Sequence, residues 1–266
     1  MSSVDLYNTS YRNGAVDAYR EIRLETYGED FGQTSWTTPE EIHHIADVLA
    51  LRRESHVVDI GCGSGGCALH FAKTIGCRID GLDVNGAGIR SGIQAARASS
   101  LDDRVHFMPY DVASGLPYIS DKFDSIYSND AFCHILDRAI LLRECLRVLK
   151  SGGRLLFSDA LVVTGALSNE EIATRSSIGH YVFVPQFENE RLLEAAGFKI
   201  VSVEDTSPRA AAIAKRWHDA RAHREEILLP IETEQNFRGL QKFLLCVHAL
   251  TNEKRLSRFL YLASKL

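Results

Sequence analysis

The sequence has 266 residues, of which 45% are hydrophobic and 24% charged, enough for one α/β domain with a full hydrophobic core. Its formal net charge of -5 argues against broad electrostatic binding to nucleic acid, and its apolar runs fall short of the roughly 20 residues of a membrane span. The six cysteines include no Cys-x-x-Cys pair, so neither a metal site nor a disulfide framework is expected. Because the start of the chain has no signal-like segment, we expect a soluble, cytoplasmic protein that contacts neither nucleic acid nor membrane.

Residues 1–54 precede the first predicted strand and carry four tyrosines: Tyr7, Tyr11, Tyr19 and Tyr27. Such aromatic residues either anchor N-terminal helices to a core or line a site, and for any single tyrosine the core interpretation is the simpler one. We expect this leader to form a helical lid over the sheet.

Residues 55–160 alternate between short apolar runs and helical patterns. The apolar run Ser55–Ile60 is cut off by glycines, as in a buried parallel strand, and a helical pattern from Ala68 to Ile75 follows it. Successive units of this kind form right-handed parallel crossovers. The later elements of this region are predicted at Arg78–Val84, Gly88–Ser99, Val105–Met108, Phe123–Tyr127, Arg138–Leu149 and Gly153–Ser158.

The pattern changes after the fifth strand. Residues 161–190 carry polar and small residues without a clean strand and are predicted to be a lid insertion. Residues 191–266 complete the domain with two strands and, between them, two helices: Phe198–Glu204, Ser257–Ala263, Arg209–Leu229 and Glu232–Leu250. The predicted fold is therefore one α/β domain with a Rossmann-like, seven-stranded, mostly parallel sheet, helices on both faces and a helical lid.

A glycine-rich loop follows the first predicted strand, in the order Asp59-Ile60-Gly61-Cys62-Gly63-Ser64-Gly65. In an open α/β sheet the ligand binds beyond the carboxyl ends of the strands where strand order reverses, and this loop belongs there. Its G-x-G-x-G spacing differs from the G-x-G-x-x-G of dinucleotide enzymes. An acid in front of the loop suits a ligand with an ammonium group better than one with phosphates, which favours S-adenosylmethionine over NAD.

From Val57 through Phe157 the sequence resembles the class I S-adenosylmethionine-dependent methyltransferases. The resemblance rests on four signals in the family's order: the loop from Asp59 to Gly65, Asp83 at the end of the second strand, Asp111 after the third, and Leu149-Lys150-Ser151-Gly152-Gly153 before the fifth. The family more often has proline in place of Ser151, a departure that affects only a turn. The resemblance implies an enzyme that uses S-adenosylmethionine and releases S-adenosylhomocysteine.

The resemblance also implies a set of cofactor-binding residues. In the family the acid that ends the second strand accepts both ribose hydroxyls, and Asp83 occupies that place. Asp111 resembles the acid that binds the adenine amino group, although a helix cap or a turn would explain either aspartate without a ligand. The predicted cofactor-binding residues are Gln33, Asp59, Gly61, Gly63, Gly65, Asp83, Val84, Asp111, Val112 and Asn129.

The segment Tyr127-Ser128-Asn129-Asp130-Ala131-Phe132-Cys133-His134 resembles one in the phosphoethanolamine and the glycine, sarcosine and dimethylglycine N-methyltransferases, and the leader from Tyr11 through Phe31 is similar to that of the phosphoethanolamine enzymes. In the phosphoethanolamine enzymes a leader tyrosine and the histidine of this segment form a hydrogen-bonded latch. The matching residues, Tyr11 and His134, are the predicted catalytic pair: His134 would handle the proton of an amine and Tyr11 would orient the imidazole. A structural histidine is the alternative.

The same resemblance gives places to the neighbours of this pair. Asn129 would face the methionine end of the cofactor, and Asp130 would attract a cationic amino substrate or complete the His134 network. Gln33 lies where the related leaders touch the cofactor, although an exposed loop glutamine is the simpler account.

Tyr19 and Tyr181 are the other predicted substrate residues. Tyr181 falls where the phosphoethanolamine enzymes place a substrate tyrosine. The stretch from Thr206 to Ala211, however, lacks the tyrosines that those enzymes carry near the phosphate, so a phosphobase substrate is not expected.

We therefore expect methyl transfer to a small-molecule acceptor, most simply to the nitrogen of an amine. Because in-line displacement needs alignment more than acid–base chemistry, O- or C-methylation of a quinone or polyketide-like natural product is the alternative. An apolar cavity under Leu161–Pro185, without an acid beside the sulfonium, would favour that alternative. A NAD-dependent oxidoreductase and a non-catalytic cofactor-binding module are further alternatives, and the oligomeric state is left open.

Overall fold

The computed structural model describes residues 4–266, which form one sheet of eight strands in the order β3-β2-β1-β4-β5-β8-β7, with the short β6 beside β5. The strands are β1 His56–Ile60, β2 Arg78–Asp83, β3 Val105–Pro109, β4 Phe123–Ser128, β5 Leu149–Val163, β6 Val184–Pro185, β7 Lys199–Asp205 and β8 Leu256–Ser264. Strands β1 to β5 run parallel, whereas β8 is antiparallel to both β5 and β7. Apart from the two-residue β6, this is the predicted seven-stranded, mostly parallel sheet, and that prediction is confirmed.

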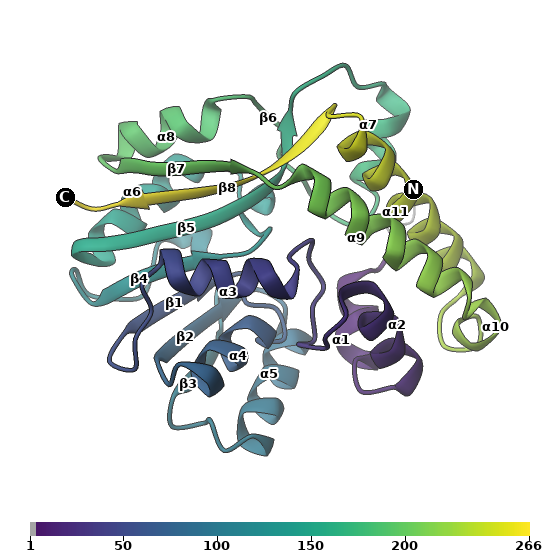
Figure 1. The fold of residues 1–266 in the computed structure, drawn as a ribbon, viewed down its shortest axis with the longest axis horizontal. Helices are drawn as coiled ribbons and strands as arrows, with labels where there is room; N and C mark the ends of the chain where they lie inside the picture. Colours follow the sequence, from purple (N-terminus) through teal and green to yellow (C-terminus); the bar gives the residue numbers. More distant parts are fainter. Residues whose placement is uncertain (1–3) are drawn as a thin grey trace.

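Helices surround the sheet and extend beyond one end of it (Figure 1). They are α1 Tyr7–Asn13, α2 Asp17–Tyr27, α3 Pro39–Val48, α4 Gly66–Thr74, α5 Gly86–Ala98, α6 Arg138–Val148, α7 Asn169–Arg175, α8 Glu188–Ala196, α9 Ser207–Ala222, α10 Glu225–Leu228 and α11 Glu234–Asn252, with 3₁₀ turns η1 Val112–Ser114 and η2 Phe132–His134. No helix within residues 4–266 is long and apolar enough to cross a membrane.

The alternation of side chains along the parallel strands divides the core into two layers. Val58 of β1 packs in the layer that α6 and α8 cover, and the adjacent Val57 packs in the layer of α3 and α4. Leu155 and Leu156 of β5 divide in the same way. Because successive residues of a strand point to opposite faces, a sheet covered on both faces requires apolar residues at consecutive positions. The apolar runs in the sequence thus correspond to helices on both faces.

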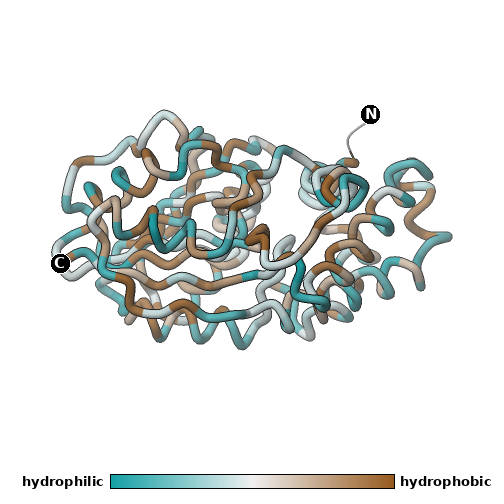
Figure 2. The backbone as a smooth tube through the Cα atoms, turned by 90° about the horizontal axis from the view of Figure 1, so that it is seen from above, coloured by the Kyte–Doolittle hydropathy of each residue, from teal (hydrophilic) through white to brown (hydrophobic). Residues whose placement is uncertain are grey.

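A third apolar cluster joins the helices at one end of the sheet. It includes Tyr19 of α2, Trp217 of α9 and Phe243 of α11, together with Trp36. Figure 1 shows α1 and α2 beside α9, α10 and α11 at this end. In Figure 2 the strands through the middle of the molecule carry much of the brown, and the outer helical turns are largely teal.

Two boundaries differ from the sequence prediction. The fifth strand, predicted to end at Ser158, continues to Val163 because its last residues pair with both β6 and β8. Residues 161–163, predicted as the start of the lid insertion, therefore belong to the sheet. The helix predicted to end at Leu229 is divided into α9 and the short α10.

Candidate active site

A cavity of about 540 Å³ opens at the carboxyl ends of β1, β2 and β4. Three parts of the chain form its walls: the loops that follow these strands and β3, the leader at residues 6–36, and the segment 175–181. The cavity lies where strand order reverses between β1 and β4, which is the ligand position of open α/β sheets.

The glycine loop forms the floor of the cavity beside β1. Gly61 and Gly63 line the cavity and have φ of +75° and +57°, values that L side chains rarely adopt. A Cβ on Gly63 would lie 2.5 Å from the Tyr11 hydroxyl. Within the described part of the chain Gly65 is not in the cavity wall; it precedes α4, and a Cβ there would overlap the ring of Phe107.

The Asp83 carboxylate is held in the cavity wall by two backbone N–H groups. Gly63 donates to its Oδ2 at 2.8 Å and Asn85 to its Oδ1 at 2.7 Å. Burial raises the pKa of Asp83 above its ordinary value. The adjacent Val84 is 70% exposed and lines the cavity, so an apolar surface and an acceptor pair lie side by side, as a nucleoside requires.

Asp111 and Val112 line the same cavity after β3. The Oδ1 atom of Asp111 accepts a hydrogen bond from the Ala113 N–H at 2.9 Å and caps η1. The turn role weighed from the sequence is therefore present, and a role toward adenine stays a prediction that the capping bond does not oppose, because a carboxylate has two oxygens.

Asp59 is the most deeply buried acid of the cavity wall, with 3% of its surface exposed. Burial, with the charge of Asp83 as a second cause, raises the pKa of Asp59 to about 8. A cationic group placed beside it would favour the ionised carboxylate. The glycine floor and this acid fit S-adenosylmethionine, which carries an ammonium and a sulfonium group.

The amide side chains predicted to touch the cofactor also hold loops in place. Gln33 is buried rather than exposed: its Oε1 accepts from the Phe31 N–H at 2.8 Å and its Nε2 donates to the Glu29 carbonyl at 3.0 Å. Asn129 donates from Nδ2 to Ser35 Oγ at 2.7 Å. Both amides line the cavity, and their contacts with the cofactor stay predictions.

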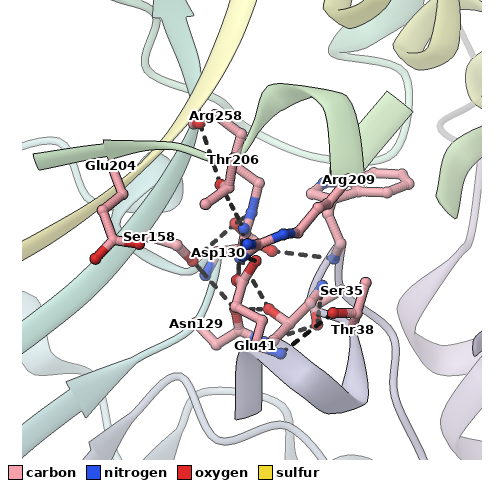
Figure 3. Close-up of polar contacts among 12 residues, drawn as sticks. Ser35, Thr38, Glu41, Asn129, Asp130, Ser158, Glu204, Thr206, Arg209 and Arg258 are labelled. Atoms are coloured by element: carbon pink, nitrogen blue, oxygen red, sulfur yellow. Dashed lines mark hydrogen bonds and ion pairs between the residues drawn. The ribbon is translucent and has the colours of Figure 1, made fainter. Parts of the chain in front are cut away.

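Asp130 is engaged in a buried ion cluster rather than free for a substrate (Figure 3). Its Oδ1 accepts from Nε of the fully buried Arg258 at 2.8 Å, and its Oδ2 accepts from the Trp36 N–H at 3.1 Å. Arg258 also donates to Glu41 Oε1 at 2.6 Å and to Thr206 Oγ1 at 2.8 Å. The cluster fastens the loop after β4 to the leader and to α3, so this geometry opposes the predicted attraction of an amine to Asp130.

His134 lines the cavity, and its hydrogen bonds define its tautomer. Nδ1 lies 2.8 Å from the His180 carbonyl, which can only accept, so Nδ1 carries the proton of the neutral ring. Nε2 then accepts from the Tyr7 hydroxyl at 2.9 Å. Burial lowers the pKa of His134, which keeps the imidazole neutral near pH 7. Tyr181 stacks on this ring, with centroids 4.5 Å apart, and its hydroxyl lies 3.3 Å from that of Tyr7.

The tyrosine bonded to His134 is therefore Tyr7, whereas the sequence comparison predicted Tyr11. The two lie four residues apart on α1, on one face of the helix, with ring centroids 6.4 Å apart. Tyr11 lines the cavity with its hydroxyl over Gly63, at the cofactor loop. Tyr7, one helical turn before Tyr11, therefore makes the contact with His134 that was predicted for Tyr11.

Tyr19 lies outside this arrangement. Its ring is buried in the helical cluster, and its hydroxyl donates to Glu232 Oε1. Within residues 4–266 it is not part of the cavity wall. Tyr19 thus has the anchoring role that was considered for the leader aromatics, whereas Tyr181 lines the cavity and its contact with a substrate stays a prediction.

Sequence reasoning did not identify Tyr7 and Arg175, which line the cavity, or Arg258, which pairs with Asp130. Arg258 gave a signal, since a cation within the apolar run of β8 requires a buried partner. Tyr7 shares its helical face with Tyr11, so spacing could not distinguish them. Arg175 lies in a polar stretch of the sequence, where an arginine gives no sign of being buried.

Comparisons with known proteins agree with this geometry. A methyltransferase domain model matches residues 58–157. The 27-O-demethylrifamycin SV methyltransferase of Amycolatopsis mediterranei (strain S699) is 29% identical over 82% of this chain and 85% of that enzyme. Phosphoethanolamine N-methyltransferase 1 of Triticum aestivum is 28% identical over 87% of this chain, which spans 45% of that enzyme.

The fold is shared with solved methyltransferases. Phosphoethanolamine N-methyltransferase 2 of Haemonchus contortus, in complex with phosphomonomethylethanolamine and S-adenosylhomocysteine, has a TM-score of 0.81 at 21% identity, over 98% of this chain and 60% of that one. The sheet order, the loop after β1 and the matched domain are those of one family. The chain belongs to the class I S-adenosylmethionine-dependent methyltransferases and is an enzyme that takes its methyl group from that cofactor.

Proposed function

We propose that this small-molecule methyltransferase methylates an oxygen of a largely apolar acceptor and that His134 takes the proton of the acceptor hydroxyl. One observation carries the proposal. The part of the cavity formed by α1, the loop after β4 and residues 175–181, which we name the acceptor end, presents the neutral imidazole of His134 and the guanidinium of Arg175. The nearby carboxylate of Asp130 is paired with Arg258.

The hydrogen bonds at the acceptor end give the proton a route. Bound S-adenosylmethionine would supply a methyl group on a positively charged sulfur. The acceptor oxygen would bond to the methyl carbon as the carbon–sulfur bond breaks, which leaves S-adenosylhomocysteine. Tyr7 donates to Nε2 of His134 at 2.9 Å, so a hydroxyl that donates to Tyr7 can lose its proton as the Tyr7 proton passes to the ring. His134 holds the proton as imidazolium, with Nδ1–H fixed on the His180 carbonyl.

The cofactor would be held by residues on the other side of the cavity. Asp83 would accept hydrogen bonds from the ribose hydroxyls, the glycine loop would allow close approach, and Asp59 would offer a carboxylate to the ammonium group. The leader and segment 175–181 would cover the crevice and exclude water.

N-methylation of an amine is the second candidate, and the N-methyltransferase names of several relatives favour it. A neutral amine could give its proton to His134 along the same route. An ammonium substrate, however, requires a free carboxylate in the acceptor end, and the geometry there offers the cation of Arg175 instead.

An acceptor panel with matched nucleophiles tests the proposal. Hydroxyquinolines, phenols and hydroxyquinones are incubated with methyl-labelled S-adenosylmethionine beside the amines that match them in ring and substitution, and NMR locates the label. We expect labelled methyl ethers. Methylation of the amine members alone would overturn the oxygen assignment and establish the second candidate.

A further inference from the structure

Four arginines of the described chain are buried to 3% exposure or less: Arg138, Arg175, Arg221 and Arg258. Three of them are paired with buried carboxylates: Arg138 with Asp159 at 2.6 Å, Arg221 with Glu232 at 2.7 Å and Arg258 with Glu41 at 2.6 Å. The exception is Arg175, for which no carboxylate within residues 4–266 lies at ion-pair distance, and its Nη1 has no hydrogen-bond partner. The same chain therefore gives buried guanidinium groups a counter-charge everywhere except at the cavity.

The surroundings of Arg175 are aromatic. Its guanidinium carbon lies 4.8 Å from the ring centroid of Tyr181, 5.1 Å from that of Phe243 and 5.9 Å from that of Trp36. Ring faces attract a cation, and this attraction offsets part of the desolvation. They do not satisfy the N–H groups of a guanidinium, which is a planar fork of five donors.

The backbone holds this charge firmly at the cavity wall. Arg175 is the last residue of α7, and a capping box of Ser168 and Glu171 fixes the start of that helix. The position at the helix carboxyl end suits a cation. Tyr181, which contacts Arg175, leads through its hydroxyl to Tyr7 and so to His134, and the charge therefore lies beside the proton route.

We propose that Arg175 binds an anionic oxygen of the methyl acceptor, carried as a carboxylate or as an ionised phenol or enol on an otherwise apolar molecule. The proposal rests on the proposed small-molecule methylation at this cavity and names the acceptor class. A planar oxyanion matches the guanidinium fork, and it supplies the counter-charge that Arg175 lacks. The aromatic rings around Arg175 would pack against the apolar remainder of the acceptor.

Binding of small probes to the wild-type enzyme, saturated with S-adenosylhomocysteine, tests the proposal without a variant. Calorimetry compares benzoate with benzamide, and 4-nitrophenol, at a pH where it is ionised, with 4-nitroanisole. We expect at least one anion to bind about tenfold or more tightly than its neutral match. Preference for benzoate identifies a carboxylate acceptor, and preference for the nitrophenolate an ionised hydroxyl. Equal binding of anions and neutral matches overturns the proposal.

Variants then assign the preference to Arg175. Arg175→Met keeps the length of the side chain without its charge, and it should abolish the anion preference while S-adenosylhomocysteine affinity stays within about twofold. Its melting temperature should equal or exceed that of the wild type, because a charge without a partner is removed. Arg221→Met, the matched control, should melt lower because it leaves Glu232 buried and unpaired.

Two outcomes separate a binding role from a structural one. If Arg175→Met melts as low as Arg221→Met and retains the anion preference, Arg175 is a structural cation and the proposal fails. If Arg175→Met does not fold, Arg175→Lys, which keeps the charge without the fork, should still bind the preferred anion several-fold more weakly; unchanged affinity contradicts the proposal. Because these measurements involve no methyl transfer, N-methylated products would overturn the oxygen assignment without touching this inference.

Discussion

The two ends of the cavity are built in different ways. The cofactor end comes mainly from one stretch of chain, the successive loops after β1, β2 and β3 between residues 59 and 113, to which the leader adds Tyr11 over the glycine loop. The acceptor end combines α1, the loop after β4 and the segment 175–181, which lie far apart in sequence. Parallel crossovers bring consecutive loops to one edge of the sheet, whereas the acceptor end depends on how helices outside the sheet pack. Local sequence motifs therefore predict the cofactor-binding end of the cavity but not the acceptor end.

The two ends also differ in charge. Asp59 and Asp83 make the cofactor end acidic, which suits a donor with ammonium and sulfonium groups. Arg175 and a neutral His134 make the acceptor end basic. A cationic donor and an acceptor that becomes an oxyanion would each meet the opposite sign, and this division accounts for methyl transfer to oxygen better than to an ammonium substrate.

The largest effect is expected at the acceptor end. His134→Ala should lower kcat by about 10²–10⁴, the range of a general base, with unchanged affinity for S-adenosylhomocysteine. The base acts when neutral and burial lowers its pKa, so wild-type kcat should rise with pH below the ordinary histidine range and be level by pH 7. Steady-state rates on an acceptor from the panel measure both. Wild-type turnover by the variant would make His134 a packing residue.

The cofactor end should respond in binding rather than in turnover. Asp83→Ala removes a charged acceptor of ribose hydroxyls and should weaken S-adenosylhomocysteine by about 10–100-fold. Asp83→Asn, which keeps one carbonyl oxygen, should fall between this variant and the wild type. The exposed Asp102→Ala serves as the control. Calorimetry that finds the same affinity for all four proteins would remove Asp83 from the site.

This contrast also describes what the sequence could predict. The mostly parallel sheet, the helices on both faces and the cofactor family follow from apolar runs and motifs that can be recognised locally in the sequence. The partner of His134 did not follow, because Tyr7 and Tyr11 repeat at the spacing of one helical turn and only the docking of α1 decides which ring reaches the imidazole. The position of Arg258 within an apolar strand indicated a buried partner, but not that Asp130 and Glu41 supply it.

Asp130 is a second residue whose role could not be predicted from the sequence alone. Asp130 lines the cavity next to Asn129, at the end of the fourth strand where the motif puts it. The motif could not show that its carboxylate is already paired, because the arginine that pairs with it comes from β8, 128 residues later. A motif predicts where a side chain lies, whereas residues distant in sequence determine whether the charge of that side chain is already paired.

The acid at the cofactor end should couple binding to pH. Since the pKa of Asp59 is about 8 and the cofactor ammonium requires the carboxylate, binding releases a proton below that pH. Affinity for S-adenosylhomocysteine should rise by up to about tenfold per pH unit toward pH 8 and then level. Asp59→Asn should bind more weakly and lose this dependence. Calorimetry across pH 6–9 measures it, and a parallel slope in the variant would assign the proton elsewhere.

The raised pKa of Asp59 has the opposite consequence for the stability of the ligand-free protein, which falls as pH rises. The folded carboxyl of Asp59 keeps its proton up to about pH 8, whereas the ordinary value is 3.8. The ligand-free wild type therefore loses stability as pH rises through that window. At pH 8 Asp59→Asn should melt higher than the wild type, by about 2–4 °C for each kcal/mol recovered, and the difference should vanish near pH 4. Thermal scans at both values decide.

The two tyrosines of α1 divide the cavity between them, and a pair of mutant cycles tests that division. Tyr7→Phe should reduce turnover about tenfold and have little further effect in His134→Ala, because the two groups act as a unit. Tyr11→Phe should chiefly weaken S-adenosylhomocysteine, and its effect should add to that of His134→Ala. The reverse pattern, with coupling between Tyr11 and His134, would show that Tyr11 acts with His134, as predicted from the sequence. It would contradict the division of the cavity between the two tyrosines.

The smallest effect concerns the order in which the covering segments tighten. The α1 helix contacts the cofactor end through Tyr11 over Gly63, and its Asn8 Oδ1 accepts from Asn85 Nδ2 at 3.0 Å. Residues 175–181 reach only the acceptor end. Hydrogen exchange should therefore slow in α1 when S-adenosylhomocysteine binds and in residues 175–181 only when an acceptor is added, by a few-fold in each case. The buried strands β1 and β4, which exchange through larger openings, provide the internal control. If both segments respond to S-adenosylhomocysteine alone, they close as one unit, and the division of the cavity into two ends does not extend to its motions.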